Sequence, residues 1–262
     1  MNTSLDTEPL AWTVAISRAD AGPGDLTTYH KEIYIGQPSS LNLKEIATVS
    51  GCALIFTGAT LQFGSNLAAN PLEDENGSCA DALPTQCVTD LMSEAQNLVN
   101  TTELQSGNLM NCATLAQFLN ARMPSTCPSS FGSTDEISTP SLSGTNMSNP
   151  STLSTCHPAL SKDYSLTHLA NMSASSEHPS SREAFEWLYG VTPVLTVFAP
   201  LDDGSSSEGP SISAAEAHLT CLKPMGNNYT TSATVVGLGS GISRTTALLY
   251  LFVALAGFGV LS

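Results

Sequence analysis

Residues 79–127, CADALPTQCVTDLMSEAQNLVNTTELQSGNLMNCATLAQFLNARMPSTC, are where the apolar pattern of the chain changes from the period of a strand to that of a helix. In residues 87–100 a cysteine and three apolar residues recur at i, i+4, i+8 and i+11, and residues 108–123 carry a second apolar stripe. This spacing places each set on one face of a helix. Pro124 ends the second helix because it has no amide proton to continue the ladder. We therefore predict two consecutive helices.

Cysteines accompany these helices, and one lies on each apolar stripe. A cysteine on a buried face is well placed to pin its helix to a neighbouring element. We predict a disulfide-stapled helical hairpin with Cys52 nearby, and spacing alone leaves the pairing open. The absence of a C-x-x-C motif favours disulfides over structural zinc or a thioredoxin-like site. The disulfide candidates are Cys52, Cys79, Cys87, Cys112, Cys127, Cys156 and Cys221.

Strand signals lie on both sides of the helical stretch. Short runs of β-branched and aromatic residues, bounded by turn residues, are typical of strands. Residues 10–17 and 29–36 are two such runs, and we expect them to pair. An apolar run predicts a buried strand at 52–57. The run at 191–198 contains Pro193, which predicts either an edge strand or a strand that starts near the proline.

These elements predict an α+β fold. It would combine a small antiparallel sheet, a disulfide-stapled helical hairpin, long Ser/Thr-rich loops and a separate C-terminal apolar helix. A capping box of Ser180 and Glu183 adds a short helix at 182–189. The expected divisions are N-terminal strands and cysteine-stapled helices at 1–132, a Ser/Thr-rich low-complexity loop at 133–155, the rest of the same domain at 156–224, a flexible stalk at 225–244 and an apolar segment at 245–262.

The C-terminal segment, Thr245–Ser262, resembles a lipid-attachment signal. It is apolar or Gly from 247 to 261, and a polar spacer precedes it. A small-residue triplet that begins at Ser232 completes the layout of a glycosylphosphatidylinositol (GPI) signal, with Ser232 as the attachment candidate. The alternative is a single-pass protein that keeps this helix. The run is shorter than the roughly 20 residues that a spanning helix needs.

Sequons support passage through the secretory pathway. The N-terminal residues, however, lack the basic and uninterrupted apolar regions of a signal peptide. We therefore expect translation to start upstream of Met1. A cysteine partner lost with that segment would explain the odd cysteine count, as would a free thiol or an intermolecular disulfide. A cytosolic tail-anchored protein is the alternative, and it would leave the sequons and most cysteines without a purpose. The N-glycosylation candidates are Asn2, Asn76, Asn100, Asn146, Asn171 and Asn228.

The charge balance excludes some partners. Eight Lys and Arg stand against 23 Asp and Glu, for a net charge of −15, and no two basic residues are adjacent. Nucleic-acid phosphates need clustered Lys or Arg, so we predict no nucleic-acid partner. The same charge opposes docking on an anionic cytoplasmic leaflet.

No motif predicts a catalytic, cofactor or metal site. The five histidines show no helical metal spacing, and no G-x-S-x-G elbow occurs. Glu73, Asp74 and Glu75 could attract calcium, although a solvated turn is the commoner fate of such a cluster. Asp202 with Asp203 could be half of a glycosidase carboxyl pair, and a polar loop is again the favoured interpretation.

Two further patterns have simple structural explanations. The glycines at 237–241 imitate a dinucleotide-binding turn, but the third glycine is missing, so we interpret them as spacer. Trp187 with Tyr189, and Trp12, could form sugar-stacking platforms. Packing in the core or at a sheet edge is the more frequent role of such residues.

Several of these features occur together in one known class of proteins. They are GCALIF around Cys52, the C-x7-C pair Cys79 and Cys87, Cys112 and Cys127, VTPVLTVF at 191–198, and the C-terminal signal. In this pattern the chain resembles filamentous-fungal GPI-anchored, cysteine-containing surface proteins, a class without an assigned molecular function. The resemblance brings no catalytic residue.

We therefore expect a lipid-anchored surface or cell-wall glycoprotein with a structural, adhesive or ligand-binding role. It would lie on the extracellular face of the plasma membrane or in the wall, held by its lipid or its C-terminal helix. Cell-wall polysaccharide is a candidate partner, and no cofactor is implied. The alternative is an enzyme that acts on wall polysaccharide through acidic residues. Two carboxyl groups within roughly 5–10 Å across an aromatic-lined groove would favour the enzyme.

Overall fold

The computed structural model describes residues 10–19, 26–38, 41–46, 48–59, 61, 78–100, 110–128, 131, 136–144, 147, 164–176, 182–201, 212, 214–224 and 233–235. The strands in this part of the chain are β1 (Ala11–Ala19), β2 (Thr27–Pro38), β3 (Val49–Phe56), β4 (Ile137–Ser138), β5 (Tyr164–Ser176), β6 (Thr192–Pro200), β7 (Glu216–Leu222) and β8 (Ala233–Val235). The helices are α1 (Cys79–Ala82), α2 (Thr85–Val99), α3 (Cys112–Ala121) and α4 (Arg182–Tyr189).

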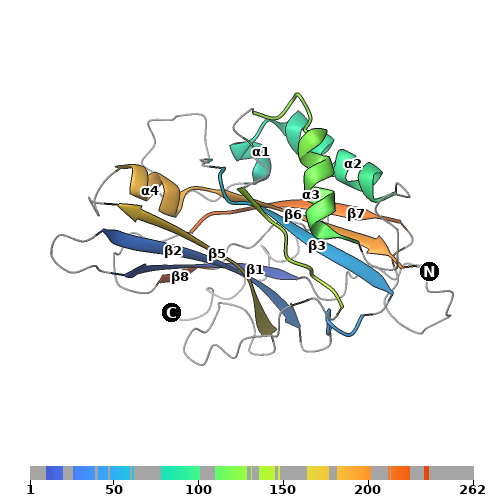
Figure 1. Cartoon of the computed structure of the whole chain (residues 1–262), viewed down its shortest axis with the longest axis horizontal. Helices are drawn as coiled ribbons and strands as arrows, with labels where there is room; N and C mark the ends of the chain where they lie inside the picture. Colours follow the sequence, from blue (N-terminus) through green and yellow to red (C-terminus); the bar gives the residue numbers. More distant parts are fainter. Residues whose placement is uncertain are drawn as a thin grey trace, which may run out of the picture.

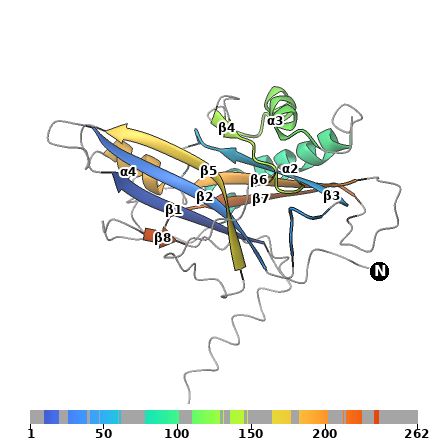
Figure 2. The same cartoon turned by 60° about the horizontal axis from the view of Figure 1, so that its bottom comes forward.

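The strands form two antiparallel sheets, each with four strands. Sheet A has the order β5-β2-β1-β8, and sheet B has the order β4-β3-β6-β7. One apolar core fills the space between the sheets, and a second lies between sheet B and the helices. Figure 1 shows α1, α2 and α3 over sheet B, with α4 apart from them near the ends of β2 and β5, and Figure 2 shows α2 and α3 beside β3 from a second side. The predicted α+β class is confirmed, with two sheets in place of one.

Strand β3 belongs to both cores. All eight of its residues are buried. Ala53 and Ile55 pack toward sheet A, whereas Cys52, Leu54 and Phe56 pack toward the helices. Alternate side chains of a strand point to opposite faces, so a strand covered on both faces is apolar throughout. The predicted buried strand at 52–57 is thus confirmed and begins at Val49.

Three disulfides tie α1 and α3 to sheet B and α2 to the segment that follows α3. Cys52–Cys112 joins β3 to α3, and Cys79–Cys221 joins α1 to β7. Cys87–Cys127 joins α2 to the segment after α3, as expected of a stapled hairpin. The seventh candidate, Cys156, lies outside the described residues.

Several predicted elements are confirmed by the structure. The runs at 10–17 and 29–36 pair as β1 and β2, and the helix at 182–189 is α4. Helix α2 spans its predicted residues almost fully, and α3 ends at Ala121, before Pro124. Strand β6 lies inside sheet B, so the edge alternative for Pro193 is wrong. The proline is the second residue of the strand, as the other alternative required.

Other segments differ from expectation. The predicted loop at 133–155 supplies the short edge strand β4, and its Leu142 is fully buried. Three residues of the predicted stalk form β8, which pairs with Val14, Ala15 and Ile16 of β1. Strands β5 and β7 come from segments without a strong strand signal. The β5 sequence, YSLTHLANMSASS, has a single β-branched residue, and long pairing with β2 compensates for this low propensity.

Candidate binding pocket

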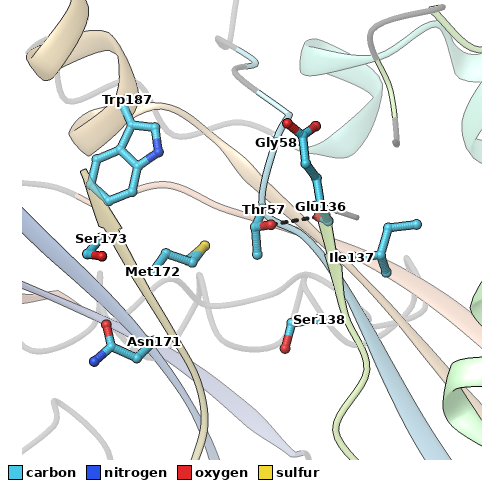
Figure 3. A pocket seen from close by; sticks show the side chains of 9 residues that line it. All are labelled: Thr57, Gly58, Glu136, Ile137, Ser138, Asn171, Met172, Ser173 and Trp187. Atoms are coloured by element: carbon cyan, nitrogen blue, oxygen red, sulfur yellow. Dashed lines mark hydrogen bonds between the residues drawn. The ribbon is translucent and has the colours of Figure 1, made fainter. Parts of the chain in front are cut away.

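A pocket of about 530 Å³ opens where the edges of the two sheets approach each other. On one side is β5, the edge strand of sheet A, and on the other are β4 and the end of β3 in sheet B. Helix α4 contributes Trp187. The lining residues, all drawn in Figure 3, are Thr57, Gly58, Glu136, Ile137, Ser138, Asn171, Met172, Ser173 and Trp187.

Strand alternation decides which side chains face the pocket. On β5, Met172 is buried and points into the space, whereas Asn171 and Ser173 are exposed and point to the other side of the strand (Figure 3). On β4, Ile137 packs toward the helices, so the neighbouring Ser138 faces sheet A. The wall therefore presents a thioether and a hydroxyl, and the edge strands add backbone groups.

The loop after β3 fixes Glu136 at the rim. The backbone N–H of Thr57 donates to the Glu136 carbonyl oxygen at 2.7 Å, and the Thr57 hydroxyl donates to the same oxygen at 2.6 Å. A Cβ atom at Gly58 would overlap the Glu136 side chain, which would then have to move. Glu136 is exposed, and within the described residues no hydrogen bond or ion pair engages its carboxylate.

A buried lysine contacts both the backbone and the ring of Trp187. Lys31 lies on β2 opposite Met172 of β5, and its side chain is 3% exposed. Its ammonium donates to the carbonyl oxygens of Trp187 at 2.8 Å and Gly190 at 3.2 Å, and to the Thr192 hydroxyl at 3.3 Å. The nitrogen also lies 5.2 Å from the centre of the Trp187 ring, within the range of a cation–π contact.

These contacts make Lys31 a cap for α4. The last carbonyl groups of a helix have no partner inside it, and they favour a positive charge. Helix α4 has no basic residue of its own in its last turn. Lys31 of sheet A supplies that charge and links α4 to Thr192, at the start of β6 in sheet B.

Burial changes the protonation of Lys31. It lowers the pKa of the Lys31 amine from 10.5 to about 7, because the interior solvates an ammonium less well than water. The Lys31 amine therefore titrates near neutral pH, and it lies beside the Trp187 ring that lines the pocket.

The predicted aromatic platforms separate into two kinds. Trp12 and Tyr189 are buried in the core between the sheets, which is the core-packing role predicted as the more frequent one. Trp187 is only partly buried and lines the pocket.

The two predicted acidic sites, at 73–75 and 202–203, lie outside the described residues. Among described residues, Glu136 is the one carboxyl group that lines the pocket, and no group of His, Cys, Asp and Glu there could hold a metal ion.

Two of the predicted glycosylation sites fall on described residues, and both are exposed. Asn100 follows the last residue of α2, and Asn171 lies on the edge strand β5. Asn2, Asn76, Asn146, Asn228 and the lipid-attachment candidate Ser232 lie outside the described residues. So does the apolar segment at 245–262. In the part of the chain that the structure describes, no helix is long and apolar enough to span a bilayer.

The residues that sequence analysis missed are Lys31, Thr57, Glu136, Ser138 and Met172. For Lys31 a signal existed, because it has the same strand parity as Ile33 and Ile35 and so faces the core. For Glu136 and Ser138, inside a Ser/Thr-rich segment, we find no comparable signal.

No family model, no curated protein and no solved structure matches the chain. The three disulfides are themselves informative about compartment, since such bonds persist in oxidising environments and are rare in the cytosol. They indicate an extracellular or secreted protein.

Proposed function

We propose that this protein is a lipid-anchored surface glycoprotein whose domain binds a ligand without catalysis. The observation that carries the proposal is the set of three disulfides, which fasten α1 and α3 to sheet B and join α2 to the segment after α3. Such covalent links form and persist in the oxidising environment outside the cell. The two exposed sequons at Asn100 and Asn171 agree with this location.

The lipid anchor rests on the sequence pattern at the C-terminus. A transamidase that cleaves after Ser232 would remove β8 together with the apolar tail. Sheet A would keep β5, β2 and β1, since β8 adds only three residue pairs at its edge. The folded domain is therefore compatible with attachment at Ser232, and the protein would be of the filamentous-fungal class that its sequence resembles.

The described part of the pocket carries groups that can bind a ligand, and the binding role is proposed on that basis. Glycoside hydrolysis in most families needs two carboxyl groups, about 5–10 Å apart, on either side of the scissile bond. The described lining of the pocket offers Glu136 alone. One carboxylate, one indole ring and a hydroxyl are a sufficient set for recognition.

Treatment of intact producing cells tests location and anchor together. We expect an antibody to stain unpermeabilised cells and phosphatidylinositol-specific phospholipase C to release the protein into the medium. Peptide N-glycosidase should then lower the mass of the released protein. Staining without release would favour a retained spanning helix, and staining only after permeabilisation would contradict the proposal.

A further inference from the structure

We propose that the pocket between β5 and β4 binds a neutral saccharide, with one sugar ring stacked on the indole of Trp187. The inference rests on the proposed ligand-binding function and names the class of ligand. It comes from the combination of an aromatic ring, a carboxylate without a partner among the described residues, and a hydroxyl around one solvent-open space.

The size and character of the pocket suit a sugar. Its volume of about 530 Å³ lies within the range of roughly 300–1,000 Å³ for small-molecule sites. The apolar face of a pyranose ring packs on an aromatic ring, and its hydroxyl groups need acceptors and donors around the edge. Trp187 and Met172 supply the apolar surface, and Glu136 and Ser138 supply the polar groups.

The tryptophan is preorganised for this role. Lys31 fixes the backbone at Trp187 through the 2.8 Å hydrogen bond and lies beside its ring. A side chain already held in place loses little conformational entropy when a ligand stacks on it. Lys31 is thus a positioning residue that does not itself line the pocket.

The Glu136 carboxylate can accept hydrogen bonds from the hydroxyl groups of the ligand. Glu136 is positioned by two hydrogen bonds from Thr57 to its backbone oxygen, which leave its side chain free of them. A carboxylate accepts hydroxyl protons in charge-assisted bonds, which are shorter and stronger than neutral ones. The two oxygens can therefore hold adjacent hydroxyl groups of one sugar.

Charge selects a neutral saccharide over charged ligands. An acidic sugar would meet the Glu136 carboxylate and a protein of net charge −15. Below about pH 7, where Lys31 is protonated, the ring of Trp187 already has a cation 5.2 Å from its centre and is less available to a cationic ligand.

The glycan of this chain is a less fitting occupant. Asn171 contributes to the lining, but its side chain points to the side of β5 opposite Met172 (Figure 3). A glycan on Asn171 would therefore start outside the pocket.

Fluorescence titration tests the proposal with the full chain, purified with its disulfides intact and treated with peptide N-glycosidase. The chain has two tryptophans, and of these Trp12 is buried in the core. We expect saturable changes in emission with at least one neutral probe among laminaritriose, mannotriose and N,N′-diacetylchitobiose. Glucuronate and choline should produce none.

Two variants and two controls assign the site. Trp187→Phe should remove the emission change, while Trp12→Phe should keep it. Glu136→Gln keeps the shape of an exposed side chain and should weaken binding about tenfold, as expected for losing a charge-assisted hydrogen bond. Glu45→Gln removes an exposed charge outside the pocket lining and should have no effect.

Failure of this inference can be told apart from failure of the proposed function. No saturable change with any neutral saccharide, or an unchanged affinity in Glu136→Gln measured by calorimetry, would overturn the saccharide site. Either result would leave phospholipase release from cells unaffected. Conversely, saccharide binding by a protein that phospholipase does not release would retain the site and overturn the anchor.

Discussion

Replacement of Lys31 by methionine should remove a distinct pH dependence of stability. Methionine fills similar space but carries no proton. The pKa of Lys31 is about 7 when folded and 10.5 when the chain is unfolded and solvated. Between these values the unfolded state binds more protons than the folded state, so the free energy of unfolding rises with pH. Below about pH 7, Lys31 is protonated in both the folded and the unfolded state. Its contribution to the free energy of unfolding then no longer changes with pH and is at its least stabilising.

The size of the effect follows from the same two pKa values. One pKa unit corresponds to about 1.4 kcal/mol, so Lys31 alone should raise the free energy of unfolding by about 2–3 kcal/mol from pH 6 to pH 9. The side chain is only 3% exposed, which justifies the use of the full shift. Three hydrogen bonds hold the amine, and their loss in Lys31→Met shifts stability at all these pH values without restoring the slope.

Urea unfolding at pH 6, 7, 8 and 9, with disulfides intact, measures this slope. The difference in unfolding free energy between wild type and Lys31→Met should change by about 2–3 kcal/mol across the series, in favour of wild type at high pH. Lys44→Met makes the same substitution at a lysine that is not buried and serves as the matched control. Parallel curves for wild type and Lys31→Met would refute the reasoning, because they would mean that the helix carbonyls keep Lys31 charged with an ordinary pKa.

Other perturbations probe the packing and the covalent links. Gly51→Ala should cost about 1–3 kcal/mol in denaturant unfolding, because a Cβ there would lie 2.6 Å from the Phe198 ring; an unchanged midpoint would show that the ring moves freely. Replacing Cys79 and Cys221 together by serine should cost about 2–5 kcal/mol, since this disulfide spans 142 residues, and thermal unfolding of the two forms checks it. Asn171→Gln should lower the mass of the secreted protein by one enzyme-sensitive glycan on a denaturing gel, and an unchanged mass would remove Asn171 as a glycosylation site.

Local patterns predicted the elements that depend on local forces. The period of 3.6 residues identified α2 and α3, and the capping box before Arg182 identified α4. Each of these signals lies within the helix that it predicts or at the start of that helix. Strand β5 was not predicted because its sequence has low strand propensity and its pairing partner, β2, lies more than a hundred residues earlier in the chain.

The site was harder to predict because it is assembled across the fold. Glu136 meets Thr57 when β4 pairs with β3, and these residues line one pocket with Trp187 only after the two sheets have packed. Nothing in their spacing along the chain reports this. The pairing of the cysteines also depends on how the whole chain folds. Cys79 pairs with Cys221 across the longest separation of the three disulfides, whereas its nearest neighbour along the chain, Cys87, pairs with Cys127.

Peptide mapping of the protein from producing cells tests the central claim most directly. If the protein is a lipid-anchored surface glycoprotein, its C-terminal peptide should end at Ser232 and carry phosphoethanolamine and glycan. A C-terminal peptide that ends at Ser262, with the apolar segment intact, would contradict the account.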